Sequence, residues 1–222
     1  MIDKELLRDT YRFKGLRRQL SETIRKKGIK DEAVIHAIGK VPRHYFLDSA
    51  FVEQAYTDKA LQIGEGQTIS QPYTVAFQTT LLEIKPGDKT LEIGLGSGYQ
   101  ACILKELGAD VYSIERIKKL YLIAEELLNF MGYNINIFLG DGSLGLPKFA
   151  PFDKILVTAA ASVVPQKLVD QLQIGGLLVV PIGDRGTQTM VRIIKTSATK
   201  YIREDHGDFR FVPMIGDGGW RY

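Results

Sequence analysis

The chain has 222 residues, of which 45% are hydrophobic and 25% are charged, and its formal net charge is +3. This composition is typical of a soluble globular protein and excludes a disordered chain, a coiled coil, a collagen-like protein and a small disulfide-framed protein. The single cysteine, Cys102, can form neither an internal disulfide nor a metal cage by itself, which favours a reducing, cytoplasmic setting.

Signals for membrane insertion or export are not found in the sequence. Residues 1–5 lack the basic-then-apolar pattern of a signal peptide. No stretch approaches the ~20 apolar residues that a membrane-spanning helix needs. We therefore expect a soluble, cytoplasmic protein without a membrane partner.

Residues 1–60 are predicted to be helical, and their first half is basic. Residues 1–30 hold ten Lys or Arg side chains and four acidic ones, so this segment alone carries +6. A basic arm for nucleic acid is one interpretation. A surface helix is the other, and the near-helical spacing of apolar residues from Leu6 to Ile24 favours it. No aromatic side chains are placed to stack on bases, so we expect no nucleic-acid partner.

The following segments carry clear start and stop signals. Asp31 is expected to cap a second helix, which Pro42 ends. Residues 61–71 are rich in glycine and polar residues and are predicted to form a loop. Pro72 suits the first turn of a helix that continues to Leu82.

From residue 89 onward, short apolar stretches alternate with amphipathic ones, as strands alternate with helices. Parallel strands need long crossover connections, so the alternation predicts an α/β fold with a doubly wound, mainly parallel sheet. The expected helices span 98–107, 117–131 and 165–173. The expected strands span 90–93, 110–114, 135–139, 154–158, 177–181, 190–194 and 209–213.

A glycine-rich segment, Leu91-Glu92-Ile93-Gly94-Leu95-Gly96-Ser97-Gly98-Tyr99, follows the first of these strands and opens a helix. In an open α/β sheet, ligands bind beyond the carboxyl ends of the strands, and glycines let the backbone approach a ligand closely. The next strand leads into Glu115, whose carboxylate could accept hydrogen bonds from both hydroxyls of a ribose. Together these features indicate a cofactor that contains a nucleoside.

The spacing of the glycines helps to distinguish a dinucleotide from other cofactors that contain a nucleoside. Dinucleotide sites use G-x-G-x-x-G, whereas Gly94, Gly96 and Gly98 form G-x-G-x-G. Glu92 lies two residues before the first glycine, where a carboxylate would repel pyrophosphate and favour a cationic ligand. S-adenosylmethionine is cationic and has no phosphate, so we expect it in preference to a dinucleotide. A glycine turn without a ligand is a third interpretation, which leaves Glu115 unexplained.

A third predicted strand ends in Leu139-Gly140-Asp141-Gly142. Asp141 could accept a hydrogen bond from the amino group of adenine, and Gly142 would let the ring lie close. Asp-Gly is also an ordinary turn dipeptide. The assignment of Asp141 to an adenine site therefore depends on its position directly after the third consecutive strand.

Common catalytic and metal-binding motifs are missing from the sequence. The three histidines, His36, His44 and His206, show no metal-ligand spacing, and G-x-S-x-G does not occur. We therefore expect no metal. A methyltransferase without an acid–base pair suits a carboxylate acceptor, because a carboxyl group with a pKa of ~4 is already ionised at pH 7. Such an enzyme needs only to align the acceptor with the methyl group and exclude water.

Longer motifs resemble those of protein-L-isoaspartate O-methyltransferases. The resemblance covers roughly residues 10–215, and its most specific motif is Gly64-Glu65-Gly66-Gln67-Thr68-Ile69-Ser70-Gln71-Pro72. Besides the glycine-rich segment, it includes Val41-Pro42-Arg43-His44, Ala55-Tyr56, Gly140-Asp141-Gly142, Ala150-Pro151-Phe152-Asp153, Val157-Thr158-Ala159-Ala160, Pro165-Gln166-Lys167-Leu168, Gln171-Leu172, Gly175-Gly176 and Phe211-Val212-Pro213.

The resemblance implies a class I S-adenosylmethionine-dependent methyltransferase fold of the Rossmann-like type. It implies methylation of the free α-carboxylate of L-isoaspartyl residues in damaged proteins and peptides, with S-adenosylhomocysteine as product and repair through a succinimide. One methyltransferase domain is then expected over 1–222. Its parts are a helical addition (1–60), a substrate loop and helix (61–88), a cofactor-binding core (89–188) and C-terminal strands (189–222). A monomer is the default expectation.

The strand ends and the resemblance together give a set of expected site residues. Ser70 is the expected catalytic residue. The expected cofactor-binding residues are Gln67, Thr68, Glu92, Gly94, Gly96, Ser97, Gly98, Glu115, Asp141 and Gly142. The expected substrate-binding residues are Thr68, Ile69, Ser70, Val212 and Pro213.

Ser70 has two interpretations. Its hydroxyl could donate a hydrogen bond that orients the acceptor carboxylate, whereas a nucleophilic role is not expected because no base partner is in sight. Alternatively, Ser70 caps the helix that follows it. The residues alone favour the cap, and the resemblance favours the functional role.

Other functions stay open at this point. They are a methyltransferase for RNA or a small molecule with the basic segment as a binding arm, a nicotinamide oxidoreductase, and a catalytically inert binding module. Leu95, Gln62-Ile63 and Asp48-Ser49 depart from the usual family pattern, and the tail over 217–222 has no counterpart in it.

Overall fold

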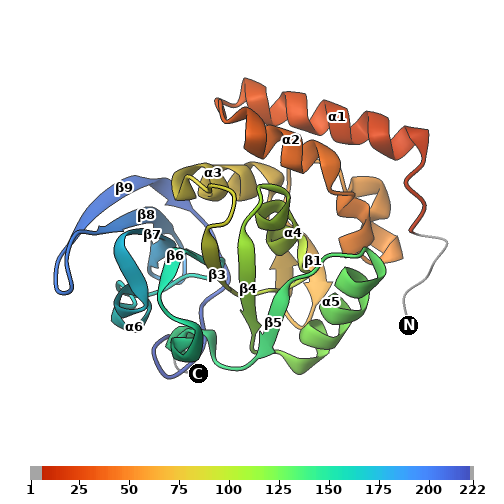
Figure 1. The fold of residues 1–222 in the computed structure, drawn as a ribbon. Coiled ribbons are helices and arrows are strands. Elements are labelled where there is room, and N and C mark those ends of the chain that lie inside the picture. Colours follow the sequence, from red (N-terminus) through yellow and green to blue (C-terminus); the bar gives the residue numbers. More distant parts are fainter. Residues whose placement is uncertain (1–6, 221–222) are drawn as a thin grey trace.

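The computed structural model describes residues 7–220, and a seven-stranded sheet forms its centre. The strands are β3 (Lys89–Ile93), β4 (Asp110–Glu115), β5 (Asn136–Leu139), β6 (Phe152–Val157), β7 (Leu172–Gly183), β8 (Gln188–Lys195) and β9 (Tyr201–Phe209). Their order in the sheet is β5-β4-β3-β6-β7-β8-β9 (Figure 1). The first five are parallel, and β8 and β9 are antiparallel to their neighbours. This confirms the predicted doubly wound, mainly parallel sheet.

Helices cover both faces of this sheet. On one face lie α3 (Pro72–Leu82), α4 (Tyr99–Glu106) and α5 (Lys118–Phe130), and on the other lies α6 (Gln166–Asp170). Successive strand residues point to opposite faces, so Leu156 packs with α3 and α4 whereas Ile155 packs with α6. Short 3-10 helices occupy Arg43–Phe46, Ser49–Gln54, Gly142–Leu144 and Pro147–Phe149.

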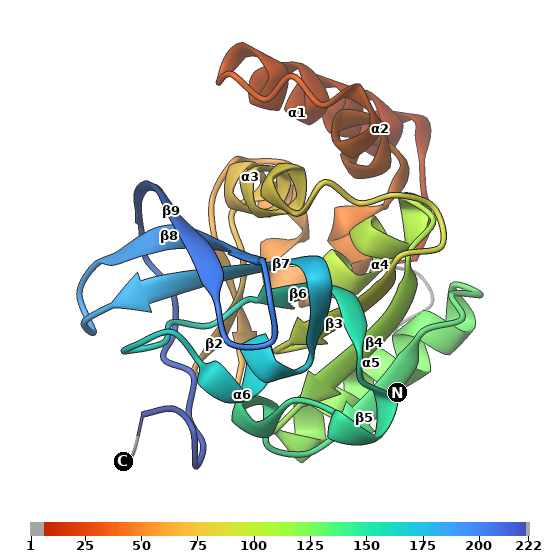
Figure 2. The same cartoon turned by 60° about the vertical axis from the view of Figure 1, so that its left-hand side comes forward.

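The predicted N-terminal helical addition forms a further layer outside α3 and α4 (Figures 1 and 2). It contains α1 (Tyr11–Lys26) and α2 (Glu32–Lys40). The Asp31 side chain caps α2 by accepting hydrogen bonds from the backbone N–H groups of Ala33 and Val34, as predicted. The surface-helix interpretation of the basic segment is confirmed over 11–26, where Leu20 and Ile24 are buried; Leu6 lies outside the described residues.

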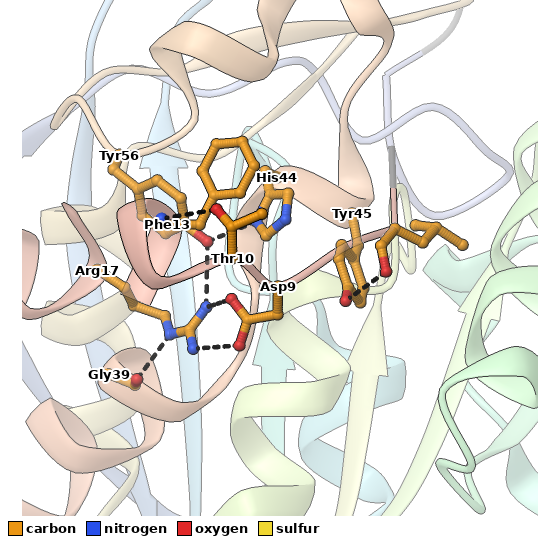
Figure 3. A network of polar contacts seen from close by, with 9 residues as sticks. Asp9, Thr10, Phe13, Arg17, Gly39, His44, Tyr45 and Tyr56 are labelled. Atoms are coloured by element: carbon orange, nitrogen blue, oxygen red, sulfur yellow. Dashed lines mark hydrogen bonds and ion pairs between the residues drawn. The ribbon is translucent and has the colours of Figure 1, made fainter. Parts of the chain in front are cut away.

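A polar network fixes α1 to the segment that follows α2 (Figure 3). The buried guanidinium of Arg17 donates to both carboxylate oxygens of Asp9 at 3.0 and 2.9 Å and to the carbonyl of Gly39 at 2.8 Å. The Tyr56 hydroxyl lies 3.2 Å from Arg17 and 2.6 Å from Nδ1 of His44, whose ring stacks on Phe13. The positive charge of Arg17, one of the basic residues of α1, is therefore paired with the Asp9 carboxylate inside the protein.

This network predicts a loss of stability in acid. Burial lowers the pKa of His44 from 6.5 to about 4. A histidine that is neutral in the fold but protonates in the unfolded chain destabilises the fold as pH falls from about 6.5 towards 4. His44→Phe is expected to flatten the pH dependence of the midpoint of thermal unfolding over this interval. An equally steep decline in the variant would assign the acid sensitivity to other groups.

Residues 61–71 differ from the predicted loop. They contain an antiparallel hairpin of β1 (Leu61–Gly64) and β2 (Gln67–Ile69), in which Leu61 pairs with Ile69. Glu65 and Gly66 both have positive φ at its turn, +52° and +67°. This geometry suits a two-residue hairpin, but the strands are too short and polar to show an alternating pattern.

The C-terminal boundaries also differ from the prediction. The strand expected at 209–213 is wrong, because β9 occupies Tyr201–Phe209 and residues 210–213 lie outside it, with Pro213 paired to Ala160 only through an isolated parallel bridge. β9 is an exposed, polar edge strand, so it lacks the apolar alternation on which the prediction depended. β7 is longer than expected and begins at Leu172, and α6 is correspondingly short.

No helix within residues 7–220 has the length and apolarity to span a membrane.

Candidate active site

The strand order reverses between β3 and β6, where a crevice is expected at the carboxyl ends of the strands. A cavity lies at this point, and we call it the switch-point cavity. Its walls come from the β1–β2 hairpin, the ends of β3 and β4, the loops after β5 and β6, and the C-terminal segment. The lining includes Gln67, Thr68, Ile93, Gly94, Gly96, Ile114, Glu115, Arg116, Gly142, Ser143, Thr158, Val212, Pro213, Met214 and Ile215.

The glycine loop has the backbone conformation that its sequence predicts. Gly94, Gly96 and Gly98 all have positive φ, at +96°, +54° and +89°. A Cβ on Gly94 would meet Oγ1 of Thr158 at 2.6 Å, so that position admits no side chain. Gly94 and Gly96 line the cavity, whereas Gly98 is buried at the start of α4 and Ser97 accepts from the Tyr99 N–H.

Glu115 holds the loop and lines the cavity. Its Oε2 accepts from the backbone N–H of Gly96 at 2.8 Å, and its Oε1 accepts from the N–H of Ile117 at 2.8 Å. The residue is 6% exposed, so these bonds fix the carboxylate at the cavity wall. Each carboxylate oxygen has a further lone pair that can accept a hydrogen bond from a ligand hydroxyl.

Glu92 lies elsewhere than expected. It is fully buried behind the cavity wall, does not line the cavity, and accepts a short hydrogen bond from the hydroxyl of Ser113. Burial raises its pKa to about 8, with a contribution from Glu115. Burial disfavours the negative charge on which our argument for a cationic ligand depended, and the side chain does not line the cavity.

The buried carboxyl group of Glu92 gives a second pH prediction. Its pKa is raised above the ordinary 4.5, so its contribution to folding is present at low pH and is lost as pH rises from about 4.5 to 8. Glu92→Gln removes this titration. The variant's unfolding temperature is therefore expected to rise relative to wild type between pH 5 and pH 8, measured by circular dichroism. A difference that stays constant with pH would contradict the burial argument.

Thr158 is a site residue that our sequence reasoning did not assign. Its hydroxyl lies 2.9 Å from the carbonyl oxygen of Ile93 and 2.8 Å from that of Gly94, so it fastens the start of the glycine loop to the end of β6. The residue follows directly after β6, next to the point of strand reversal. Its position at the end of a predicted strand is the sequence feature that could have identified it as a site residue.

The C-terminal segment covers Asp141. Oδ1 of Asp141 accepts from the N–H and hydroxyl of Ser143, and Oδ2 accepts from the N–H of Asp217 at 2.8 Å. The N–H of Gly218 donates to the Ser143 hydroxyl at 2.9 Å. Asp141 itself is not part of the cavity lining, although Gly142 is. Residues 212–215 thus line the cavity, and Asp217 and Gly218 cover Asp141 and Ser143 from outside; residues 221 and 222 lie outside the described part.

Ser70 lies on a second concave surface, which we call the acceptor groove. It shares Thr68, Thr158 and Val212 with the switch-point cavity. The alternative that Ser70 caps the next helix is wrong, because the N-cap of α3 is Gln71 and the α3 amide N–H of Tyr73 donates to Asp58 at 2.8 Å.

The backbone carbonyl group of Ser70 is held in place. Nη2 of the fully buried Arg43 donates to the Ser70 carbonyl at 2.9 Å. Val212 also borders the groove, and Pro213 borders the switch-point cavity. Ile69 differs from our expectation, because its side chain is buried in the core and only its backbone remains for contact with a substrate.

The described residues contain no group of three or more His, Cys, Asp or Glu side chains that could hold a metal ion. An open sheet with a glycine loop after β3 and a carboxylate at the end of β4 is shared by α/β proteins that bind nucleoside cofactors. The G-x-G-x-G spacing of the loop favours the class I S-adenosylmethionine-dependent methyltransferases over dinucleotide-binding enzymes.

Comparisons with known proteins identify the family. The family model for protein-L-isoaspartate(D-aspartate) O-methyltransferase matches residues 16–218. A protein-L-isoaspartate O-methyltransferase of Cytophaga hutchinsonii is 55% identical, with 96% of this chain and 97% of the relative covered. One of Dictyoglomus thermophilum is 47% identical with the same coverage. The chain therefore belongs to the protein-L-isoaspartate(D-aspartate) O-methyltransferase family.

Solved structures agree with this assignment. A protein-L-isoaspartate O-methyltransferase superimposes with a TM-score of 0.82 at 29% identity, over 91% of this chain and 66% of that protein. The alignment thus spans just under two thirds of that protein's length. A putative Plasmodium falciparum enzyme of the same name, in complex with S-adenosyl-L-homocysteine, gives a TM-score of 0.78 at 26% identity, over 90% of this chain and 98% of that one.

Proposed function

We propose that the protein transfers a methyl group from S-adenosylmethionine to the free α-carboxylate of L-isoaspartyl residues in damaged proteins and peptides. Family membership supports the reaction. The observation that supports this reaction most directly is that the switch-point cavity and the acceptor groove are contiguous. The switch-point cavity and the acceptor groove meet at Thr68, Thr158 and Val212, with Ser70 on the groove side.

The residues of the switch-point cavity fit a nucleoside-bearing methyl donor. Glu115 presents carboxylate lone pairs to ribose hydroxyls, and the loop from Gly94 to Gly98 brings backbone atoms close to the ligand. A Cβ on Gly142 would meet Ile93 at 2.6 Å, so a side chain there has no room. S-adenosylmethionine supplies a methyl group made electrophilic by its attachment to a sulfonium.

The acceptor side needs orientation more than proton transfer. An α-carboxylate is already anionic at neutral pH, so no general base is required to activate it. We assign the Ser70 hydroxyl to donate a hydrogen bond to one carboxylate oxygen, which leaves the other directed at the methyl group. Arg43, through the Ser70 carbonyl, keeps this serine in position. The backbone amide nitrogen of the following residue then attacks the carbonyl of the resulting methyl ester, and methanol leaves as the succinimide forms. Addition of water opens the succinimide, and one of the two products is normal aspartate.

A paired-peptide assay tests this function. The wild-type protein is incubated with methyl-labelled S-adenosylmethionine and either an isoaspartyl peptide or its aspartyl twin of identical sequence. Label is expected on the isoaspartyl peptide and not on the twin, and it should be lost in mild alkali because it is an ester. Equal labelling of both peptides, or of neither, would contradict the proposal. We also propose that the protein acts in the cytoplasm, which suits its single, buried Cys102.

A further inference from the structure

The acceptor groove extends beyond the position of the methyl acceptor. It has a volume of about 820 Å³, which lies within the usual range of ligand-binding pockets. Ser70 accounts for only one point on its surface. The remaining surface is continuous with Ser70, so it is available for contact with the chain on either side of the isoaspartyl residue.

One wall of this groove is aromatic. Tyr73 and Phe77 come from α3, and Phe209 and Phe211 come from the end of β9 and the residues that follow it. Ring centroids lie 5.9 Å apart for Tyr73 and Phe77 and 5.1 Å apart for Phe77 and Phe209. Figures 1 and 2 show β9 running beside α3, which brings these distant parts of the sequence together. We call these four side chains the aromatic wall.

The aromatic wall is only partly covered by the protein itself. All four side chains are half-buried, and all four line the groove. Apolar surface in contact with water gains free energy when a ligand covers it, and aromatic rings offer large, rigid contact surfaces. A side chain that covers the wall would therefore bind more tightly if it is apolar.

The charged residues of the groove do not favour one sign of charge. Asp208 and Arg210 are both exposed at its edge, and their opposite charges offset each other. His206 also lines the groove and lies 3.4 Å from Glu204. The Lys27 ammonium over the Tyr73 ring is paired with Asp58. Selection among neighbouring side chains is thus expected to depend on apolar contact.

We propose that the aromatic wall binds a side chain one or two residues from the isoaspartyl residue, so that the enzyme prefers damaged sites with a large apolar neighbour. This inference rests on the proposed function. A serine at that position would leave the wall in contact with water, whereas a leucine would cover it. The difference is worth about tenfold in kcat/KM, as is usual for an apolar group in an open hydrophobic pocket.

The experiment uses five short isoaspartyl peptides. The parent has serine at the two positions on each side of the isoaspartyl residue, and each of the other peptides replaces one serine with leucine. We expect at least one leucine peptide to show about tenfold higher kcat/KM than the parent with the wild-type protein. If the parent and all leucine peptides are unmethylated, the proposed function fails. If all are methylated within twofold of one another, only the selectivity is overturned.

Variants then locate the preference on the wall. Phe77→Ala and, separately, Phe211→Ala are expected to reduce the leucine preference to below threefold, and Phe77→Leu is expected to keep most of it. Phe130→Ala, an exposed position on α5, is the matched control and should leave the preference unchanged. If both alanine variants keep the wild-type ratio of kcat/KM between the leucine peptide and the parent, the leucine side chain binds elsewhere and the inference is overturned. Unchanged affinity for S-adenosylhomocysteine confirms that each variant is folded.

Discussion

Glu115→Ala is expected to raise the Kd for S-adenosylhomocysteine by roughly 100-fold or more. The carboxylate accepts from the backbone N–H groups of Gly96 and Ile117 and faces the switch-point cavity, where it would also accept from the ligand's ribose. A hydrogen bond to a charged group is worth about 1.5–3 kcal/mol, and two of them account for a factor of this size. Isothermal titration calorimetry measures the change.

A matched variant separates the charge from the shape of this side chain. Glu115→Gln keeps the size of the side chain and one acceptor oxygen, so its loss of affinity should be smaller than that of the alanine variant. Thermal unfolding without ligand checks that the glycine loop stays in place. A Glu115→Ala protein that binds S-adenosylhomocysteine as tightly as wild type would remove this residue from the donor site.

Ser70→Ala is expected to lower kcat by about 10- to 100-fold while leaving the Kd for S-adenosylhomocysteine within twofold of wild type. The serine lines the acceptor groove and not the switch-point cavity, so its loss should affect acceptor orientation alone. One hydrogen bond to an anionic acceptor, at about 1.5–3 kcal/mol, corresponds to a factor of this size.

The hydroxyl group itself can be tested with Ser70→Thr, which keeps the donor and should retain much of the rate. Because Asp58, and not Ser70, bonds to the first turn of α3, the alanine variant should unfold at nearly the wild-type temperature. Wild-type turnover of Ser70→Ala on an isoaspartyl peptide would show that the serine does not orient the acceptor.

The parts of the site that were predictable depend on local chemistry. The positive φ values at Gly94, Gly96 and Gly98 require glycine, so the loop is visible in the sequence as three glycines after an apolar strand. Glu115 could be located because the end of a parallel strand fixes where its side chain emerges. The doubly wound, mainly parallel sheet followed from the alternation of apolar and amphipathic stretches, whereas the strand order and its reversal beside β3 come from the structure.

The parts that were missed depend on contacts between distant residues. Glu92 has the spacing of a ligand-binding acid, but packing against Ser113 and the sheet buries it. The tail residue Asp217 lies 76 positions from Asp141, to which it bonds, and no local pattern marks that contact. β9 was misplaced because an edge strand with both faces exposed has no apolar periodicity.

A crystal structure with both S-adenosylhomocysteine and an isoaspartyl peptide bound tests the central claim most directly. Our account predicts that the ribose hydroxyls contact Glu115, that the sulfur lies beside the loop from Gly94 to Gly98, and that the peptide's free carboxylate lies at Ser70 with its chain along the acceptor groove. A nucleoside bound away from this loop, or a peptide carboxylate remote from Ser70, would contradict it.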